Sequence, residues 1–381
     1  MTGEKKKKIL FGLVFTLLSM PLVQYNLNLL KSMELKGYYQ SAQDTTFTKQ
    51  AWWSGGYQEQ KTKYINDNVG FRPDLVRISH QVDFSLFNMV HSNGILGKEQ
   101  YLFYKEYIDA YLGRDFLGYK EIADISSKMK YLHDVFKARN KKFVMVFAPS
   151  KADCLPEYLP EHPLDTITGP TNREVYKRYF DSLGIAYIDF NEVFSELKKT
   201  KKRVFSKQGI HWTVYGATFA VDSFANYISR ESNIPMPDFD YTLTQTDVPR
   251  SADNDIGASL NLITPMKESF IYPTISIRND SMKNKPSAVY VGYSFMWLLI
   301  EDSIGRLHNH WEFWPYFVDA HRDGQYQTDI SSYNWKGSLD NADYVFILYT
   351  CPNLDELPKF INRAYEAYKK EEAEPASANW R

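Results

Sequence analysis

Residues 288–295 read Ala-Val-Tyr-Val-Gly-Tyr-Ser-Phe and place a serine just beyond a short apolar run. The run from 288 to 292 has the length and composition of a buried strand, and the residues from 297 to 304 have the composition of a helix. Ser294 therefore lies on a predicted strand-to-helix turn. In α/β sheets, such turns present reactive groups at the carboxyl ends of the strands.

Working outward, the same combination of apolar runs and helical periodicity recurs along the chain. Further buried strands are predicted at 143–148, 185–190 and 344–349. The intervening helices are predicted around 122–135, after the capping box Thr171–Glu174, around 214–228 and from about 355 to 370. Helices alternating with short β-rich runs predict an α/β fold, a parallel sheet flanked by helices on both faces.

The remaining segments divide the chain. We predict a basic segment at 1–8, a membrane helix at 9–30, and a stalk with helical and hairpin parts at 31–118. The α/β domain is predicted to span 119–368, with a loop and β insertion at about 236–287. The tail 369–381, rich in Lys, Glu, Ala and Pro, is predicted to be disordered.

The N-terminal segment favours an uncleaved signal anchor. Lys5 to Lys8 precede a stretch without charge from Ile9 to Leu30, and no small-residue cleavage motif follows it. Lysines ahead of the helix place the N-terminus in the cytoplasm and export the rest. A cleaved signal peptide is the alternative.

Composition excludes some functions. The formal net charge of -1 provides no global field for nucleic acid. No metal-type Cys/His cluster or phosphate-binding glycine loop is present, so we predict neither a metal nor a cofactor. The two cysteines, Cys154 and Cys351, either remain free and buried or form one disulfide.

A histidine completes the candidate site. His211 precedes a predicted helix, and a serine nucleophile needs such a base within hydrogen-bond reach. A third group usually orients the base. The position two residues before the histidine is Gly209, which has no side chain to do so. Pattern alone also allows a capping serine and a structural histidine.

The order of sequence blocks resembles the SGNH-hydrolase-like proteins of bacterial polysaccharide O-acetylation, the AlgX/AlgJ kind, and their relatives named for a D-H-H-W motif. The blocks that carry the resemblance are Tyr64–Asn68 with Phe71-Arg72, Gly94–Tyr104, Phe147–Lys151 with Pro156–Pro160, His211-Trp212-Thr213 with Gly216-Ala217, and Gly292–Phe295. They span about 60 to 350, and the histidine block precedes the serine block as it does in that family.

The resemblance implies that Ser294 is the nucleophile and His211 its general base. The family's aspartate position falls on Gly209, so Asp189, Asp153 and Asp255 are the candidate substitutes.

Four further residues are candidate substrate contacts. Lys151 follows a predicted strand and could meet an anionic sugar, with a structural ion pair as the alternative. Tyr293, Trp212 and Trp297 lie in or beside the two site blocks, where aromatic faces can stack on sugar rings. Core packing is the alternative for each ring.

The function implied by the resemblance is a membrane-anchored extracytoplasmic O-acyltransferase, most simply an O-acetyltransferase, that modifies a cell-surface or exported polysaccharide. The family usually acts beside a membrane-bound O-acyltransferase (MBOAT) partner, and the domain would lie in the periplasm or at the cell surface. Two alternatives stay open: a carbohydrate esterase with water as acceptor, and a catalytically degenerate glycan-binding adaptor of an acylation or secretion complex.

Overall fold

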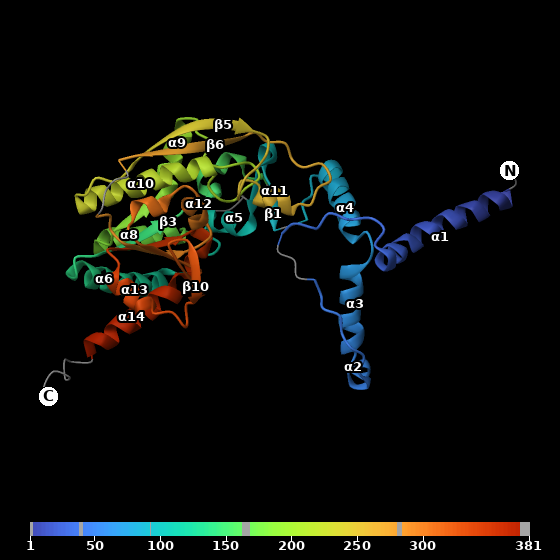
Figure 1. The fold of residues 1–381 in the computed structure, drawn as a ribbon, viewed down its shortest axis with the longest axis horizontal. Coiled ribbons are helices and arrows are strands. Elements are labelled where there is room, and N and C mark those ends of the chain that lie inside the picture. Colours follow the sequence, from blue (N-terminus) through green and yellow to red (C-terminus); the bar gives the residue numbers. More distant parts are fainter. Residues whose placement is uncertain (1–2, 38–40, 92, 162–167, 280–283, 374–381) are drawn as a thin grey trace. The chain divides into compact units, whose positions relative to one another are not determined.

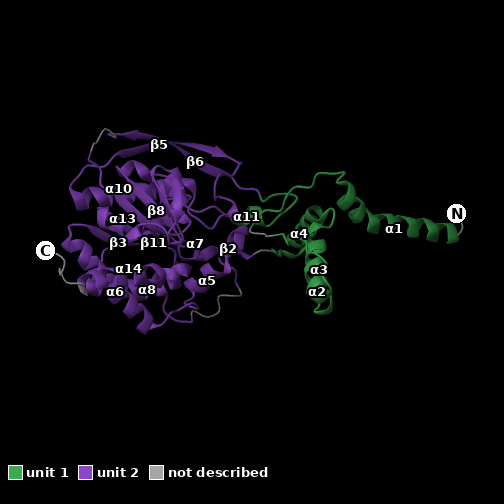
Figure 2. Ribbon diagram, turned by 60° about the horizontal axis from the view of Figure 1, so that its bottom comes forward, with its two compact units in different colours: residues 1–92, 256–266 green, residues 93–255, 267–381 purple. Residues whose placement is uncertain are grey.

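The computed structural model describes residues 3–37, 41–91, 93–161, 168–279 and 284–373. The chain divides into two compact units, which are Met1–Ser92 with Ile256–Met266 and Asn93–Asp255 with Lys267–Arg381 (Figure 2). Ser294, His211 and the three candidate acids all belong to the second unit.

The first unit is helical. Its helices are α1 (Gly3–Leu27), α2 (Lys49–Trp53), α3 (Gly56–Asn68) and α4 (Arg72–Phe87). The α1 helix is long and apolar enough to cross a membrane, a property that signal sequences share. The segment 256–266 packs on α4, where Nδ1 of His80 lies 2.8 Å from the Leu260 carbonyl oxygen.

The second unit is built on a seven-stranded sheet with the order β10-β9-β8-β7-β11-β3-β4. The strands are β3 (Lys142–Phe147), β4 (Tyr187–Asp189), β7 (Ala288–Gly292), β8 (Trp311–Pro315), β9 (Asp319–Arg322), β10 (Gln325–Asp329) and β11 (Tyr344–Tyr349). The five strands from β8 to β4 are parallel; the sequence patterns predicted four of them as a parallel sheet but did not reveal β8. Strands β9 and β10 add an antiparallel edge that the sequence patterns did not reveal, so the sheet is mixed.

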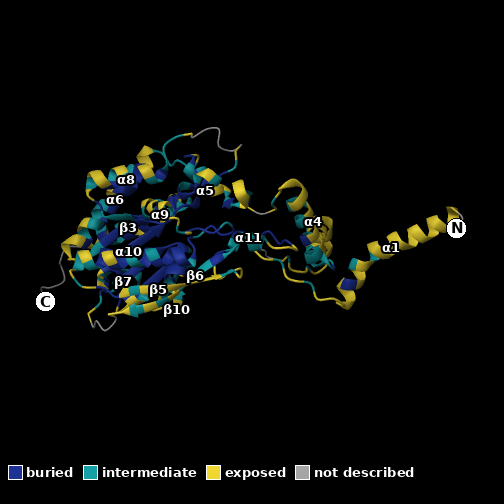
Figure 3. Cartoon of the chain, turned by 90° about the horizontal axis from the view of Figure 1, so that it is seen from above, coloured by how far each residue is buried: buried dark blue, intermediate teal, exposed yellow. Residues whose placement is uncertain are grey.

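Helices cover both faces of this sheet (Figures 1 and 3). On one face, α6 (Tyr119–Ala138), α8 (Asn172–Leu183) and α14 (Leu357–Ala373) share a core with alternate residues of β3, β7 and β11. On the other face, Phe224 of α10 (Val214–Ser232) packs against Phe346 and Tyr290, with ring centroids 5.0 and 5.8 Å away. Burial on both faces explains why these strands are uninterrupted apolar runs.

Shorter elements complete the unit. They are the hairpin β1 (Gly94–Leu96) and β2 (Leu102–Tyr104), and the helices α5 (Lys105–Tyr111), α7 (Lys151–Cys154), α9 (Phe190–Lys199), α12 (Phe295–Glu301) and α13 (Trp335–Asn341). The predicted capping box of Thr171 and Glu174 starts α8, and Gly184 ends it with a positive φ of 66°.

The segment 236–287 contains two nine-residue strands, β5 (Asp238–Thr246) and β6 (Phe270–Arg278), which pair as a separate antiparallel sheet. The short helix α11 (Asp255–Ser259) lies between them in sequence.

The C-terminal residues and the two cysteines can be compared with their predictions. The predicted disorder from Lys369 is wrong for residues 369–373, because they form the last turn of α14, and 374–381 lie outside the described residues. Cys154 and Cys351 are both free and buried.

Candidate functional site

Ser294 directly precedes α12 at the carboxyl edge of β7. A Cβ atom on Gly292 would lie 2.0 Å from the Leu348 carbonyl oxygen, so only glycine allows the strand to lie this close to β11. Beyond it, the Tyr293 amide donates to the same carbonyl at 3.2 Å. The glycine two residues before the serine is therefore required by sheet packing, and it fixes where the serine emerges.

His211 meets Ser294 from the loop before α10. Its Nε2 atom lies 2.8 Å from Ser294 Oγ, and its ring packs against Phe295 with centroids 4.6 Å apart. The loop is held in place because the Thr213 amide donates to the Val204 carbonyl at 2.9 Å and the Thr213 hydroxyl caps α10. The predicted proximity of the serine and the histidine is therefore present in the fold.

The other ring nitrogen of His211 meets an acid. Its Nδ1 atom lies 2.6 Å from Asp255 Oδ2, and Asp255 Oδ1 accepts the Ile210 amide at 3.0 Å. A carboxylate at Nδ1 requires the tautomer with its proton on that atom, which leaves Nε2 free to accept the serine proton. Ser294, His211 and Asp255 thus form one continuous hydrogen-bonded series.

The other two candidate acids lie elsewhere on the sheet edge. Arg173 donates to Asp153 at 3.1 Å and to Asp189 at 2.7 Å, and Lys177 donates to Asp189 at 2.7 Å. Burial raises the pKa of Asp153. Burial also opposes ionisation of Asp189, but the adjacent Arg173 and Lys177 lower its pKa overall. Both acids therefore serve an ion network rather than His211.

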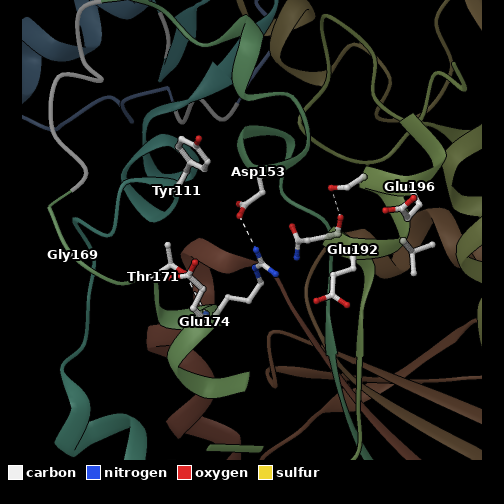
Figure 4. Close-up of a pocket in the computed structure, with 11 residues that line it drawn as sticks. Tyr111, Asp153, Gly169, Thr171, Glu174, Glu192 and Glu196 are labelled. Carbon is white, nitrogen blue, oxygen red and sulfur yellow. Dashed lines mark hydrogen bonds and ion pairs between the residues drawn. The ribbon is translucent and has the colours of Figure 1, made fainter. Parts of the chain in front are cut away.

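Asp153 and Arg173 of this network line a cavity of about 820 Å³ beyond the ends of β3 and β4. Figure 4 shows Asp153, Tyr111 and Glu192 among the residues that line it. Most of the carboxylates that line this cavity already have basic or backbone partners. Glu174, for example, accepts the backbone amide of Thr171 in the capping box.

The geometry also explains Gly209. A Cβ atom there would lie 2.6 Å from the Ala252 carbonyl oxygen, 2.8 Å from Ser206 Oγ and 3.0 Å from the Asp253 carbonyl oxygen. The segment that delivers Asp255 thus occupies the space that a side chain at 209 would need. The acid is supplied by a different part of the chain, and the glycine accommodates it.

Three of the predicted substrate contacts are buried. Lys151 and Trp212 both have an exposure of 0%, and Tyr293 is also buried. The Trp212 indole donates to the Phe295 carbonyl at 3.2 Å and so packs in the core behind the site. Lys151 donates to backbone carbonyls instead of reaching solvent. These positions give the three residues internal roles in place of the expected sugar contacts.

Trp297 differs, because its side chain is 38% exposed. It lies one helical turn after Ser294, and its ring meets His321 edge-on with centroids 5.3 Å apart. His321 in turn meets Tyr326 at 5.6 Å. An aromatic surface therefore begins beside Ser294. The contributions of His321 and Tyr326 were missed because the strands β9 and β10 that carry them were not predicted.

Comparison with known proteins agrees with this architecture. Residues 95–267 match the family described as SGNH hydrolase-like domain, acetyltransferase AlgX. This segment is therefore similar to SGNH-hydrolase-like domains. The match confirms the resemblance drawn from the sequence blocks and the predicted α/β fold class. His211 and Asp255 lie inside the matched segment, and Ser294 lies beyond it.

Two relatives match a shorter stretch. A stretch of 153 residues is 26% identical to the probable alginate O-acetylase AlgJ of Pseudomonas syringae pv. tomato, covering 40% of this chain and 37% of the relative. The corresponding protein of Pseudomonas putida is 27% identical over 154 residues, with coverages of 40% and 38%. The matched stretch thus spans less than two fifths of either relative.

Solved structures to which the chain is similar include the O-acetyltransferase domain of Pseudomonas putida AlgJ, at 16% identity and a TM-score of 0.46, covering 72% of this chain and 99% of that one. Bacillus cereus PatB1 with a sulfonyl adduct gives 18% identity and a TM-score of 0.47, with coverages of 69% and 97%.

Proposed function

We propose that this protein is an O-acetyltransferase that modifies a cell-surface or exported polysaccharide through Ser294, His211 and Asp255. The observation that carries the proposal is the hydrogen-bonded series, with distances of 2.8 Å from Ser294 Oγ to His211 Nε2 and 2.6 Å from His211 Nδ1 to Asp255. The names of the two AlgJ relatives support acetylation of a polysaccharide as the reaction class.

The first half-reaction forms an acetyl-enzyme. Ser294 Oγ attacks the carbonyl carbon of the acetyl donor while its proton passes to His211 Nε2. The bond from the acetyl group to the donor's leaving group then breaks, and the leaving group takes the proton from the imidazolium. Asp255 stabilises the imidazolium between these events. The backbone N–H group of Phe295, the first residue of α12, is the candidate donor to the oxyanion, because the next two amides donate to the carbonyls of Tyr293 and Ser294.

The second half-reaction transfers the acetyl group. A sugar hydroxyl gives its proton to His211 and attacks the acetyl carbon of the acetyl-Ser294 ester. The Ser294 Oγ–acetyl bond breaks, and the serine recovers the proton from His211. With water in place of the sugar hydroxyl, the same site would be a carbohydrate esterase.

The adaptor alternative loses its main support. It rested on Gly209 in the position where the family carries its acid. Asp255 contacts His211 directly, so the missing side chain at 209 does not leave the imidazole without an orienting carboxylate.

Membrane attachment and partner are further parts of the proposal. The length and composition of α1 support an anchor that keeps the second unit outside the cytoplasm, with the N-terminus inside. Since an exported domain has no cytoplasmic acetyl donor, a membrane-bound O-acyltransferase (MBOAT) partner would supply acetyl groups across the membrane.

The test uses the full chain purified in detergent with a chromogenic acetyl ester, with and without acetyl-free oligosaccharides. We expect ester cleavage and acetylated sugar from the wild type, and neither from Ser294→Ala or His211→Ala. Product formation that persists in both variants would refute the proposal. Release of acetate alone, at a rate that no oligosaccharide changes, would favour the esterase.

A further inference from the structure

Lys151 is a fully buried cation next to the histidine loop. It is the first residue of α7, and its side chain has an exposure of 0%. Its ammonium donates to three backbone carbonyls, those of Leu102 at 2.7 Å, Lys207 at 3.0 Å and Gly209 at 2.8 Å. Because an ammonium has three N–H groups, these bonds use all of them.

Burying a charge is unfavourable unless polar groups compensate for lost water. Burial lowers the pKa of Lys151 to about 7, and the nearby carboxylates of Glu268 and Asp255 oppose this shift. The ring faces of Tyr101 and Phe103 lie 5.4 and 5.2 Å from the ammonium. Packing alone would not require a charge at this position, so the three carbonyl bonds are the distinctive contribution of the lysine.

Backbone amides of the same loop also form hydrogen bonds. The Lys207 amide donates to Glu268 at 2.8 Å, the Gly209 amide donates to Ser206 Oγ at 2.7 Å, and the Ile210 amide donates to Asp255 at 3.0 Å. Lys151 thus fixes the carbonyl side of the loop while these groups fix its amide side. In each set, the bond nearest to His211 in sequence is made by Gly209 or Ile210, within two residues of the histidine.

We infer that Lys151 is a positioning residue, which clamps the carbonyls of residues 207 and 209 so that His211 lies between Ser294 and Asp255. This inference rests on the proposed function of those three residues. Without the ammonium, the Gly209 carbonyl loses its donor in a buried site, and the loop must move to satisfy it, whereas the Lys207 carbonyl still accepts the Leu102 amide at 2.8 Å. A displacement of about 1 Å at a catalytic group can lower the rate about 100-fold.

The test compares Lys151→Met with Lys141→Met in the full chain. Lys141 is a matched control, because it also donates to a backbone carbonyl, that of Ala342 at 2.8 Å, and burial also lowers its pKa. We expect Lys151→Met to lower kcat for an acetyl ester about 100-fold, with KM changed less than about 3-fold. Amide hydrogen exchange in peptides covering 204–212 should become faster in this variant alone.

If Lys151→Met fails to fold, Lys151→Leu, which also has no side-chain N–H donor, replaces it under the same criteria. A wild-type kcat in the folded variant, or an equal loss in Lys141→Met, would overturn the inference. If the wild type turns over no ester, the proposed function fails and hydrogen exchange alone decides. Faster exchange in 204–212 for Lys151→Met would then still support the clamp, and unchanged exchange would overturn it.

Discussion

Gly209→Asp places a carboxylate two residues before His211, where the family resemblance would put one, yet we expect it to impair the site. Ala252 and Asp253 present their carbonyl oxygens to Gly209, and the Asp255 amide donates to the Ala252 carbonyl at 3.3 Å. A side chain at 209 therefore pushes on the turn that carries the acid.

The size of the effect follows from the contact distances. A Cβ atom at 209 would lie 2.6 Å from the Ala252 oxygen and 3.0 Å from the Asp253 oxygen, distances that force one of the two segments to shift. Overpacking of this kind costs about 1–3 kcal/mol of stability. A shift of Asp255 and His211 by about 1 Å lowers the rate about 100-fold. Aspartate adds its own charge to the same buried space, so we expect kcat to fall at least about 100-fold.

The assay is cleavage of a chromogenic acetyl ester, with kcat and KM determined alongside the melting temperature. Gly56→Asp is the matched control, because a Cβ atom at 56 meets nothing closer than 3.6 Å. The reasoning is refuted if Gly209→Asp is as active as the wild type. It is also refuted if Gly209→Asp restores activity to an Asp255→Ala variant, because position 209 would then hold a working acid.

Three further outcomes are expected. Asp255→Asn should lower kcat by about 10³–10⁴-fold with little change in KM, because the amide favours the wrong tautomer of His211; ester kinetics measure it. Burial raises the pKa of Asp302 to about 8 in the folded protein. Above about pH 4 the unfolded chain releases the proton of this carboxyl, whereas the folded protein keeps it. The free energy of unfolding therefore falls as the pH rises from about 4 to 8. We expect Asp302→Asn to raise the melting temperature more at pH 8 than at pH 4. Trp297→Ala should raise KM for an oligosaccharide acceptor about 10-fold if its exposed face stacks on a sugar ring, which acceptor titration measures.

The sheet was predictable for the strands that are uninterrupted apolar runs, but β8, which is equally buried and contains Glu312 and Pro315, was not predicted. The strands β3, β7 and β11 are such runs, and each was placed within a residue or two. The strands β9 and β10 escaped because they lie at the sheet edge and consist mainly of polar residues, so they resemble a loop in composition.

The candidate site was predictable only in part. Ser294 and His211 each adjoin an element whose sequence pattern is clear, but Asp255 lies in a segment with no periodicity, and only the tertiary fold brings it to the imidazole. It was one of three acids that the sequence could not rank. Lys151 was expected to meet an anionic sugar or to form an ion pair, because lysines are rarely buried without a charged partner; its actual carbonyl partners come from two distant segments.

The most direct test of the central claim is to look for the acetyl-enzyme itself. The full chain would be incubated with an acetyl donor, quenched within the first turnover, and digested for mass spectrometry. We predict an acetyl group on the peptide that contains Ser294 in the wild type, which disappears from Ser294→Ala and is strongly reduced in His211→Ala. Acetyl transfer to an oligosaccharide by Ser294→Ala at the wild-type rate would contradict the account.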